Sequence, residues 1–158
     1  MEGNLALDET QEEVRTEKYL SFFINDQCYG IPISLVIEII GMQKMAEVPE
    51  FPYYAKGIIN LRGLIVPLID VRLRIGYPEA PYTEKTCVIV VNCEGIEMGL
   101  IVDEVDEVLD IPDSDINPPT RSTDEAVERY VDGVAVLPDK LTLLMSCEKI
   151  IGEGYLDY

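Results

Sequence analysis

The sequence predicts a small all-β protein. Its apolar, β-branched runs are short, turn-forming pairs such as Arg62-Gly63 and Glu94-Gly95 separate them at nearly regular spacing, and no long amphipathic helical pattern interrupts them. Such a chain favours β-barrels or a sandwich over a parallel sheet. Its 158 residues, 47% of them apolar, are enough for one compact domain, which could be divided into two lobes.

The first expected hairpin joins residues 19–25 to residues 28–33 through the turn Asp26-Gln27. Apolar side chains alternate along the first of these segments with the period of a strand. The stretch 33–40 that follows is rich in isoleucine and valine, and it fits either a helical turn or a buried strand. The sequence leaves both alternatives open.

Three further hairpins are expected along the rest of the chain. They join residues 56–61 with 64–71, 86–92 with 96–103, and 131–137 with 141–146. Glycine or a Pro-Asp pair at each turn supplies the backbone conformation that a tight connection needs. Pro67 cannot donate to a ladder, so its position should face an edge or a bulge. With the opening hairpin, at least eight strands are expected.

Both ends of the chain are predicted to be tails. Residues 1–17 are mostly polar or charged and are expected to form a flexible N-terminal tail, residues 18–152 the folded domain, and residues 153–158 a C-terminal tail. Within the domain, Ser122 and Glu125 have the spacing of a capping box, which predicts one or two helical turns there.

The chain carries 30 acidic against 12 basic residues, a formal net charge of −18. That charge repels phosphate backbones and anionic lipids, so no nucleic-acid partner is expected; it serves solubility or steers the chain towards a basic partner surface. No apolar stretch approaches the roughly 20 residues of a membrane helix, and the start of the chain is unlike a signal peptide. We therefore expect a soluble cytoplasmic protein whose four cysteines are reduced thiols with packing roles.

The sequence offers no catalytic or metal-binding constellation. It contains no histidine, which removes the usual general base and the commonest metal ligand. It also has no serine in a Gly-x-Ser-x-Gly context, no glycine-rich loop followed by lysine, and no cysteine pair at metal-ligand spacing. We therefore expect no enzymatic activity, no cofactor and no metal.

One acidic run, between residues 103 and 110, is a candidate for a cation site. It lacks the glycine that a calcium-binding loop has at its sixth position. Val102, Val105 and Val108 recur through the run at a regular spacing. This pattern predicts a packed element with a solvated acidic face.

Arg62 is the strongest candidate for a binding residue. It occupies the tip of an expected hairpin between apolar strands, where its planar, multi-donor head suits recognition of carboxylates or carbonyls. The alternative is a surface arginine that pairs with Asp70 or another acid. The residues by themselves leave both interpretations open.

A set of short motifs follows in order along most of the chain. The most specific is Asn60-Leu61-Arg62-Gly63 with Pro67 and Asp70-x-Arg72, and the supporting motifs are Cys28-Tyr29-Gly30-Ile31, Val36-x-Glu38-Ile39, Gly99-Leu100-Ile101-Val102-Asp103 and Asp132-Gly133-Val134. In this ordered set the chain resembles the CheW family of chemotaxis coupling proteins, over about residues 18–151. The resemblance favours Arg62 as a site residue.

The resemblance implies a fold, a function and two surfaces. The fold would be two apposed five-stranded SH3-like β-barrels with short helical turns. The function would be that of a non-catalytic adaptor, a monomer when isolated, which holds the cytoplasmic helical hairpin of a chemoreceptor and the regulatory domain of the histidine kinase CheA together at the inner face of the membrane. The receptor-facing surface would consist of Val36, Glu38, Lys56, Gly57, Arg62 and Gly63, and the kinase-facing surface of Met45, Ala46 and Val48.

Further expectations concern the core, the loop at residues 121–123 and the alternative functions. Leu20, Phe22 and Ile24 should line the core of one barrel, and residues 88–91 the other barrel or the space between them. Residues 121–123 lack the aromatic anchor expected from relatives, which puts secondary ring-forming contacts to the kinase in doubt. Two other functions stay open: a scaffold of a non-flagellar sensory array and, from a different class, an acidic mimic of nucleic acid.

Overall fold

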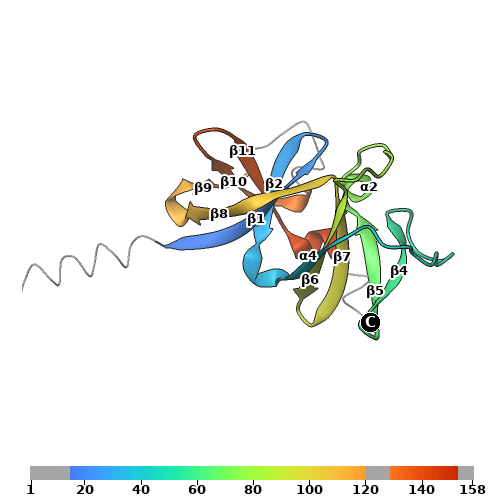
Figure 1. Cartoon of the computed structure of the whole chain (residues 1–158). Coiled ribbons are helices and arrows are strands. Elements are labelled where there is room, and N and C mark those ends of the chain that lie inside the picture. Colours follow the sequence, from blue (N-terminus) through green and yellow to red (C-terminus); the bar gives the residue numbers. More distant parts are fainter. Residues whose placement is uncertain (1–14, 120–128, 153–158) are drawn as a thin grey trace, which may run out of the picture.

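Two curled β-sheets make up the structure, a computed structural model that describes residues 15–119 and 129–152 (Figure 1). The six-stranded sheet has the order β8-β1-β2-β11-β10-β9, and the part of the protein built on it is called lobe A. The five-stranded sheet, with the order β3-β6-β7-β5-β4, builds lobe B. The predicted all-β fold with two SH3-like lobes is confirmed. Lobe A has six strands instead of five, because the two-residue strand β9 extends its edge.

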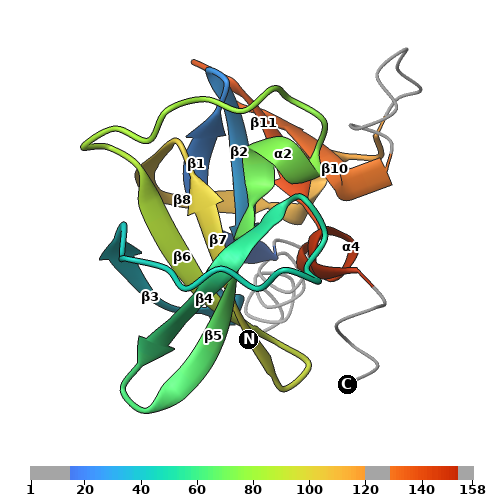
Figure 2. The ribbon, with the colours of Figure 1, turned by 90° about the vertical axis from the view of Figure 1, so that its right-hand side faces the viewer.

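The two lobes do not correspond to two halves of the chain. Lobe A consists of β1 (Thr16–Ile24), β2 (Gln27–Pro32), β8 (Glu104–Pro112), β9 (Ile116–Asn117), β10 (Val131–Val136) and β11 (Leu141–Met145). Lobe B consists of β3 (Val36–Gly41), β4 (Ala55–Leu61), β5 (Leu64–Asp70), β6 (Cys87–Cys93) and β7 (Ile96–Val102). Short helices in the described part are η1 (Ile33–Leu35), α2 (Val71–Arg74), η2 (Asp113–Asp115) and α4 (Cys147–Ile151). The chain leaves lobe A after β2 and returns to it at β8 (Figure 2).

The four hairpins predicted from their turn residues are present as the antiparallel pairs β1–β2, β4–β5, β6–β7 and β10–β11. The first turn is shifted by one residue from the prediction. β1 ends at Ile24, and Asn25 and Asp26, both with positive φ, form the turn. Asn and Asp tolerate this left-handed conformation better than most residues, which explains the choice of turn.

Two stretches of the chain have structures that the sequence left open or did not predict. Residues 33–40 begin with the 3-10 turn η1 and continue as β3, which is a strand but not a buried one, because every second residue of it is exposed. The acidic run lies mostly on β8, a strand of nine residues that pairs antiparallel with β1. Val108 on this strand is 50% exposed. The regular valine spacing therefore makes no buried stripe, because residues three apart lie on opposite faces of a strand.

The folded part begins earlier than predicted. β1 starts at Thr16, so residues 16 and 17 belong to lobe A and not to a tail. The helix expected from Ser122, the rest of the loop around residues 121–123, and nearly all of both expected tails lie outside the described residues.

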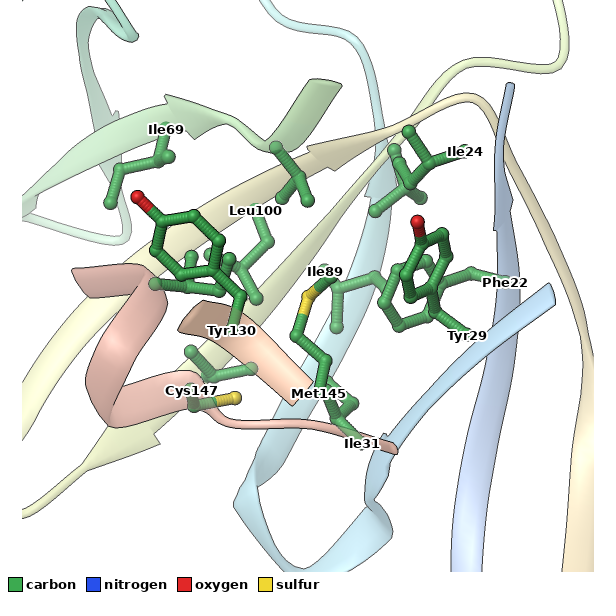
Figure 3. Packing of buried hydrophobic residues seen from close by; sticks show 14 of the residues in the cluster. Phe22, Ile24, Tyr29, Ile31, Ile69, Ile89, Leu100, Tyr130, Met145 and Cys147 are labelled. Carbon is green, nitrogen blue, oxygen red and sulfur yellow. The ribbon is translucent and has the colours of Figure 1, made fainter. Parts of the chain in front are cut away.

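The largest apolar core lies between the two sheets, as Figure 3 shows. Leu20, Phe22 and Ile24 belong to this inter-lobe core, so their predicted placement inside one barrel is wrong. The interior of lobe A instead takes the other face of β1, with Tyr19. Both faces of β1 are buried, and alternation alone does not say which face meets the other lobe.

Each lobe also has a smaller core of its own. In lobe A it consists of Tyr19, Ile111, Ala135 and Leu144. In lobe B it consists of Ile59, Val66, Leu68, Val88, Val90 and Ile101. Residues 88–91 are thus divided by strand alternation: Val88 and Val90 point into lobe B, whereas Ile89 and Val91 join the inter-lobe core.

Candidate functional site

The β4–β5 hairpin carries Arg62 at its tip. Arg62 and Gly63 have φ angles of 54° and 86°, the left-handed conformation that a two-residue turn between twisted strands requires. The Asn60 Oδ1 atom accepts a hydrogen bond of 2.9 Å from the Gly63 N–H. The turn is therefore fixed by backbone geometry and by Asn60, and the Arg62 side chain is left 63% exposed.

The Arg62 guanidinium forms an ion pair with Glu38 on β3. Because β3 and β4 are the two outermost strands of the lobe B sheet, this contact joins the two ends of the curled sheet. The hydrogen bond from Arg62 lowers the pKa of Glu38, and the same bond raises the pKa of Arg62. Arg62 thus pairs with an acid, but that acid is itself one of the predicted receptor-facing residues.

Asp70 and Arg72, the other charged residues of the main motif, support the fold. Asp70 is buried; it caps α2 by accepting a backbone N–H at 3.3 Å and accepts the Tyr82 hydroxyl at 2.9 Å. Burial raises the pKa of the Asp70 carboxyl. Arg72 donates to both carboxylate oxygens of Asp103, which also accepts the backbone N–H of Asn25 in lobe A at 2.8 Å. These contacts tie α2 to both lobes.

Gly57 allows the segment after β3 to run along β4. The backbone N–H and C=O of Ala46 each bond to Ile58 at 2.9 Å, and a Cβ at Gly57 would lie 2.6 Å from the Ala46 carbonyl oxygen and 3.1 Å from Met45 Cβ. Pro67 lies opposite Ile58 on β5, an inner strand between β4 and β7, so its predicted position at an edge or a bulge is wrong. Ile58 directs both backbone groups to Ala46, and the register of β5 with β7 begins one residue after Pro67, at Leu68. The close approach places the two predicted partner surfaces side by side.

We expect Gly57→Ala to lower the free energy of unfolding by about 1–3 kcal/mol, the usual range for overpacking. The added methyl group overlaps the Ala46 carbonyl oxygen, so the two segments must separate. Gly41→Ala is the matched control, because a Cβ there meets no atom within 4 Å. Urea unfolding followed by circular dichroism measures both variants. A Gly57→Ala midpoint equal to that of the wild type would contradict the close packing of these backbones.

The remaining predicted site residues differ in how they are held. The Lys56 ammonium binds the Glu79 carboxylate at 2.8 Å. Val36 is half-buried and packs against the inter-lobe core, whereas Met45 packs against the lobe B core. Val48 is also half-buried. All nine predicted residues therefore belong to lobe B or to the segment that joins β3 to β4.

Exposed apolar side chains lie next to the ion pair, and the sequence did not predict them. Ile37 and Ile39, which flank Glu38, are 44% and 43% exposed, and Leu64 and Ile65, directly after the hairpin turn, are 54% and 61% exposed. The isoleucine-rich run fitted either a helical turn or a buried strand, but β3 is an edge strand and buries only part of its side chains. Exposed aliphatic residues beside a charged pair are typical of a protein-binding surface.

The acidic run is paired with basic residues from other parts of the chain. The ion pairs are Arg72–Asp103, Lys85–Glu104, Lys140–Asp106, Lys140–Glu107 and Lys18–Asp110. Within residues 15–119 and 129–152, no group of three or more His, Cys, Asp or Glu side chains is placed to hold a metal ion. The run therefore acts as a partner for basic side chains in the fold.

Buried thiols are the other chemically distinctive groups. All four cysteines are free, and burial raises the pKa of Cys28, Cys93 and Cys147, the last to about 12. Thiols in this state are poor nucleophiles at neutral pH. Among the helices of the described part, none is long and apolar enough to cross a membrane.

Known proteins resemble this chain over most of its length. The model of the CheW-like domain family matches residues 18–154. The chemotaxis protein CheW of Klebsiella aerogenes is 31% identical over 96% of this chain and 91% of its own, and that of Bacillus subtilis is 37% identical over 76% and 75%. The crystal structure of the scaffolding protein TtCheW from Thermoanaerobacter tengcongensis is 32% identical and superposes with a TM-score of 0.81, covering 88% of this chain and 94% of that one.

Proposed function

Because the chain belongs to the CheW-like domain family of chemotaxis proteins, we propose that it is a non-catalytic adaptor that couples the cytoplasmic tip of a chemoreceptor to the regulatory domain of the histidine kinase CheA. The Thermoanaerobacter relative is described as a scaffolding protein, which supports this role. The adaptor works in the cytoplasm, at receptor arrays on the inner face of the membrane.

The observation that supports a binding role most directly is the surface around Arg62. A rigid turn presents a guanidinium that is paired with Glu38, and exposed aliphatic residues adjoin both partners of the pair. A charged fork beside apolar side chains suits a helical hairpin, which offers carboxylates and backbone carbonyls together with an apolar face. The proposed receptor surface consists of Val36, Glu38, Lys56, Gly57, Arg62 and Gly63.

The proposed kinase surface lies beside it, around Met45, Ala46 and Val48. Ala46 bonds to β4 at Ile58, next to Gly57 of the receptor surface. An adaptor must hold both partners at once, so these adjoining surfaces must be usable at the same time. Simultaneous occupancy is therefore the property to test.

The test is reconstitution with a soluble receptor-tip fragment and the isolated regulatory domain of CheA. We expect a binary complex with each partner by calorimetry, and a ternary complex in size-exclusion chromatography when all three are mixed. Failure to bind either partner would reject the proposal. Two partners that displace each other would reject the adaptor role in particular, because a coupling protein cannot bind them in competition.

A further inference from the structure

Arg74, the last residue of α2, reaches across to α4 at the other end of the folded chain. Its Nε atom donates to the Ile150 carbonyl at 2.8 Å and its Nη2 atom to the Lys149 carbonyl at 3.2 Å. The guanidinium carbon lies 4.3 Å from the ring centre of Tyr54 and 5.1 Å from that of Tyr130. Arg74 thus bonds to the end of one helix and stacks against rings that precede a lobe B strand and a lobe A strand.

α4 depends on such a contact because it is too short to be stable by itself. It has five residues; the Ser146 hydroxyl caps its start, and backbone bonds join the Ile150 N–H to the Ser146 carbonyl and the Gly152 N–H to the Glu148 carbonyl. Helices of this length do not persist in water without tertiary support. A cation at the C-terminal carbonyls satisfies acceptors that the helix leaves free and interacts favourably with its dipole.

Gly152 provides the space that Arg74 needs. Its φ angle is 84°, and a Cβ at this position would lie 2.9 Å from the Arg74 Nη2 atom. The same glycine therefore ends α4 with a positive φ, which a residue without a Cβ adopts easily, and lets the guanidinium approach the last carbonyls of the helix.

α4 closes one side of the inter-lobe core. Ile150 and Ile151 are fully buried, and Cys147 is 4% exposed. Beside the helix is a pocket of about 230 Å³, whose lining includes Cys93 from the β6–β7 hairpin and Cys147. Leu35, immediately before Val36 of the proposed receptor surface, lines the same pocket. Movement of α4 would uncover this part of the core without breaking a strand ladder.

We propose that Arg74 is a latch on α4: while it is bound, the helix seals the inter-lobe core, and when it is released, the helix opens as a local unit while both sheets stay folded. α4 belongs to neither strand ladder, so it can open separately from both sheets, in the way that proteins open locally in small cooperative units. The buried thiols report on it directly, because Cys147 and Cys93 lie at α4 and its pocket, whereas Cys28 lies on β2 in lobe A.

The experiment measures labelling of each cysteine by N-ethylmaleimide in the native protein, resolved by peptide mass spectrometry at fixed pH. In Arg74→Met, labelling of Cys147 and Cys93 should be about tenfold faster or more, the factor expected from losing one charge-assisted hydrogen bond. Labelling of Cys28 should be unchanged. Arg74→Lys keeps the charge but loses the planar fork, so its rates should be intermediate. Arg129→Met, which removes an exposed arginine, is the matched control and should label like the wild type.

Amide hydrogen exchange provides the second measurement. The Ile150 and Gly152 amides should exchange faster in Arg74→Met, while amides in the β6–β7 ladder keep their protection. Unchanged labelling of Cys147 would overturn the proposal. An equal acceleration at Cys28, Cys93 and Cys147 would overturn it as well, because it would show loss of global stability without a local latch.

Discussion

Replacing Phe22 with alanine is expected to lower the free energy of unfolding by about 3–5 kcal/mol, the range for truncation of a fully buried aromatic side chain. Phe22 has no exposed surface, belongs to the inter-lobe core and stacks on Tyr29 with ring centres 6.0 Å apart. Its removal leaves a cavity between two sheets. Neither sheet can close that cavity alone, because each is held by its own core and its own ladders.

The neighbouring residue provides a matched control. Phe23 is half-buried and follows Phe22 on the same strand, so Phe23→Ala removes the same atoms from a site that solvent already reaches. Its effect on the urea midpoint should be clearly smaller. A loss below about 1 kcal/mol for Phe22→Ala would mean that the inward face of β1 is assigned wrongly.

The hairpins were predictable because each has a local signal. A turn pair such as Arg62-Gly63 or Glu94-Gly95 sets the conformation of its own backbone, and the flanking runs alternate with the period of a strand. The arrangement of the lobes was not predictable in this way. Tyr19 and Leu20 are both buried, one inside lobe A and the other between the lobes, and alternation separates the two faces without saying what each one meets.

β8 shows a second limit of the sequence. Its carboxylates suggested a solvated face. The place of β8 in the sheet instead depends on residues that are remote in the chain. Lys18 and Lys140 bind its side chains from β1 and from the loop between β10 and β11. A bulge against β1 is also closed by Ser21, whose hydroxyl donates to the Glu107 carbonyl at 2.8 Å. Such contacts follow from tertiary structure, which no local pattern encodes.

The candidate site was predictable to a similar extent. The exposed position of Arg62 follows from the turn, but its pairing with Glu38 joins two edges of a sheet that are remote in sequence. The exposed isoleucines beside Glu38 were not predictable, because an apolar run gives no indication that its strand lies at an edge. The local conformation of the site residues could therefore be predicted from the sequence, whereas the residues that they contact in the fold could not.

Replacing Arg62 with alanine is expected to weaken binding of a receptor-tip fragment about thirtyfold or more, the usual loss for an interfacial arginine hot spot. The melting temperature should hardly change, because the side chain is largely exposed and the turn is held by backbone geometry and Asn60. Arg62→Lys should restore binding only in part, since it keeps the charge and loses the planar fork. Calorimetric titrations of the fragment, with parallel thermal melts, measure both properties.

The ion pair with Glu38 allows a sharper version of this test, because Arg62 could act on the receptor directly or by orienting the Glu38 carboxylate. A cycle of Arg62→Ala, Glu38→Gln and the double variant separates the two roles. If Arg62 touches the receptor, its removal still weakens binding in the Glu38→Gln background; if it only orients Glu38, that further loss disappears. Equal affinities for the wild type, Arg62→Ala and Arg62→Lys would reject the receptor role. A large drop in melting temperature would instead assign Arg62 to the fold, where its bond to Glu38 closes the sheet of lobe B.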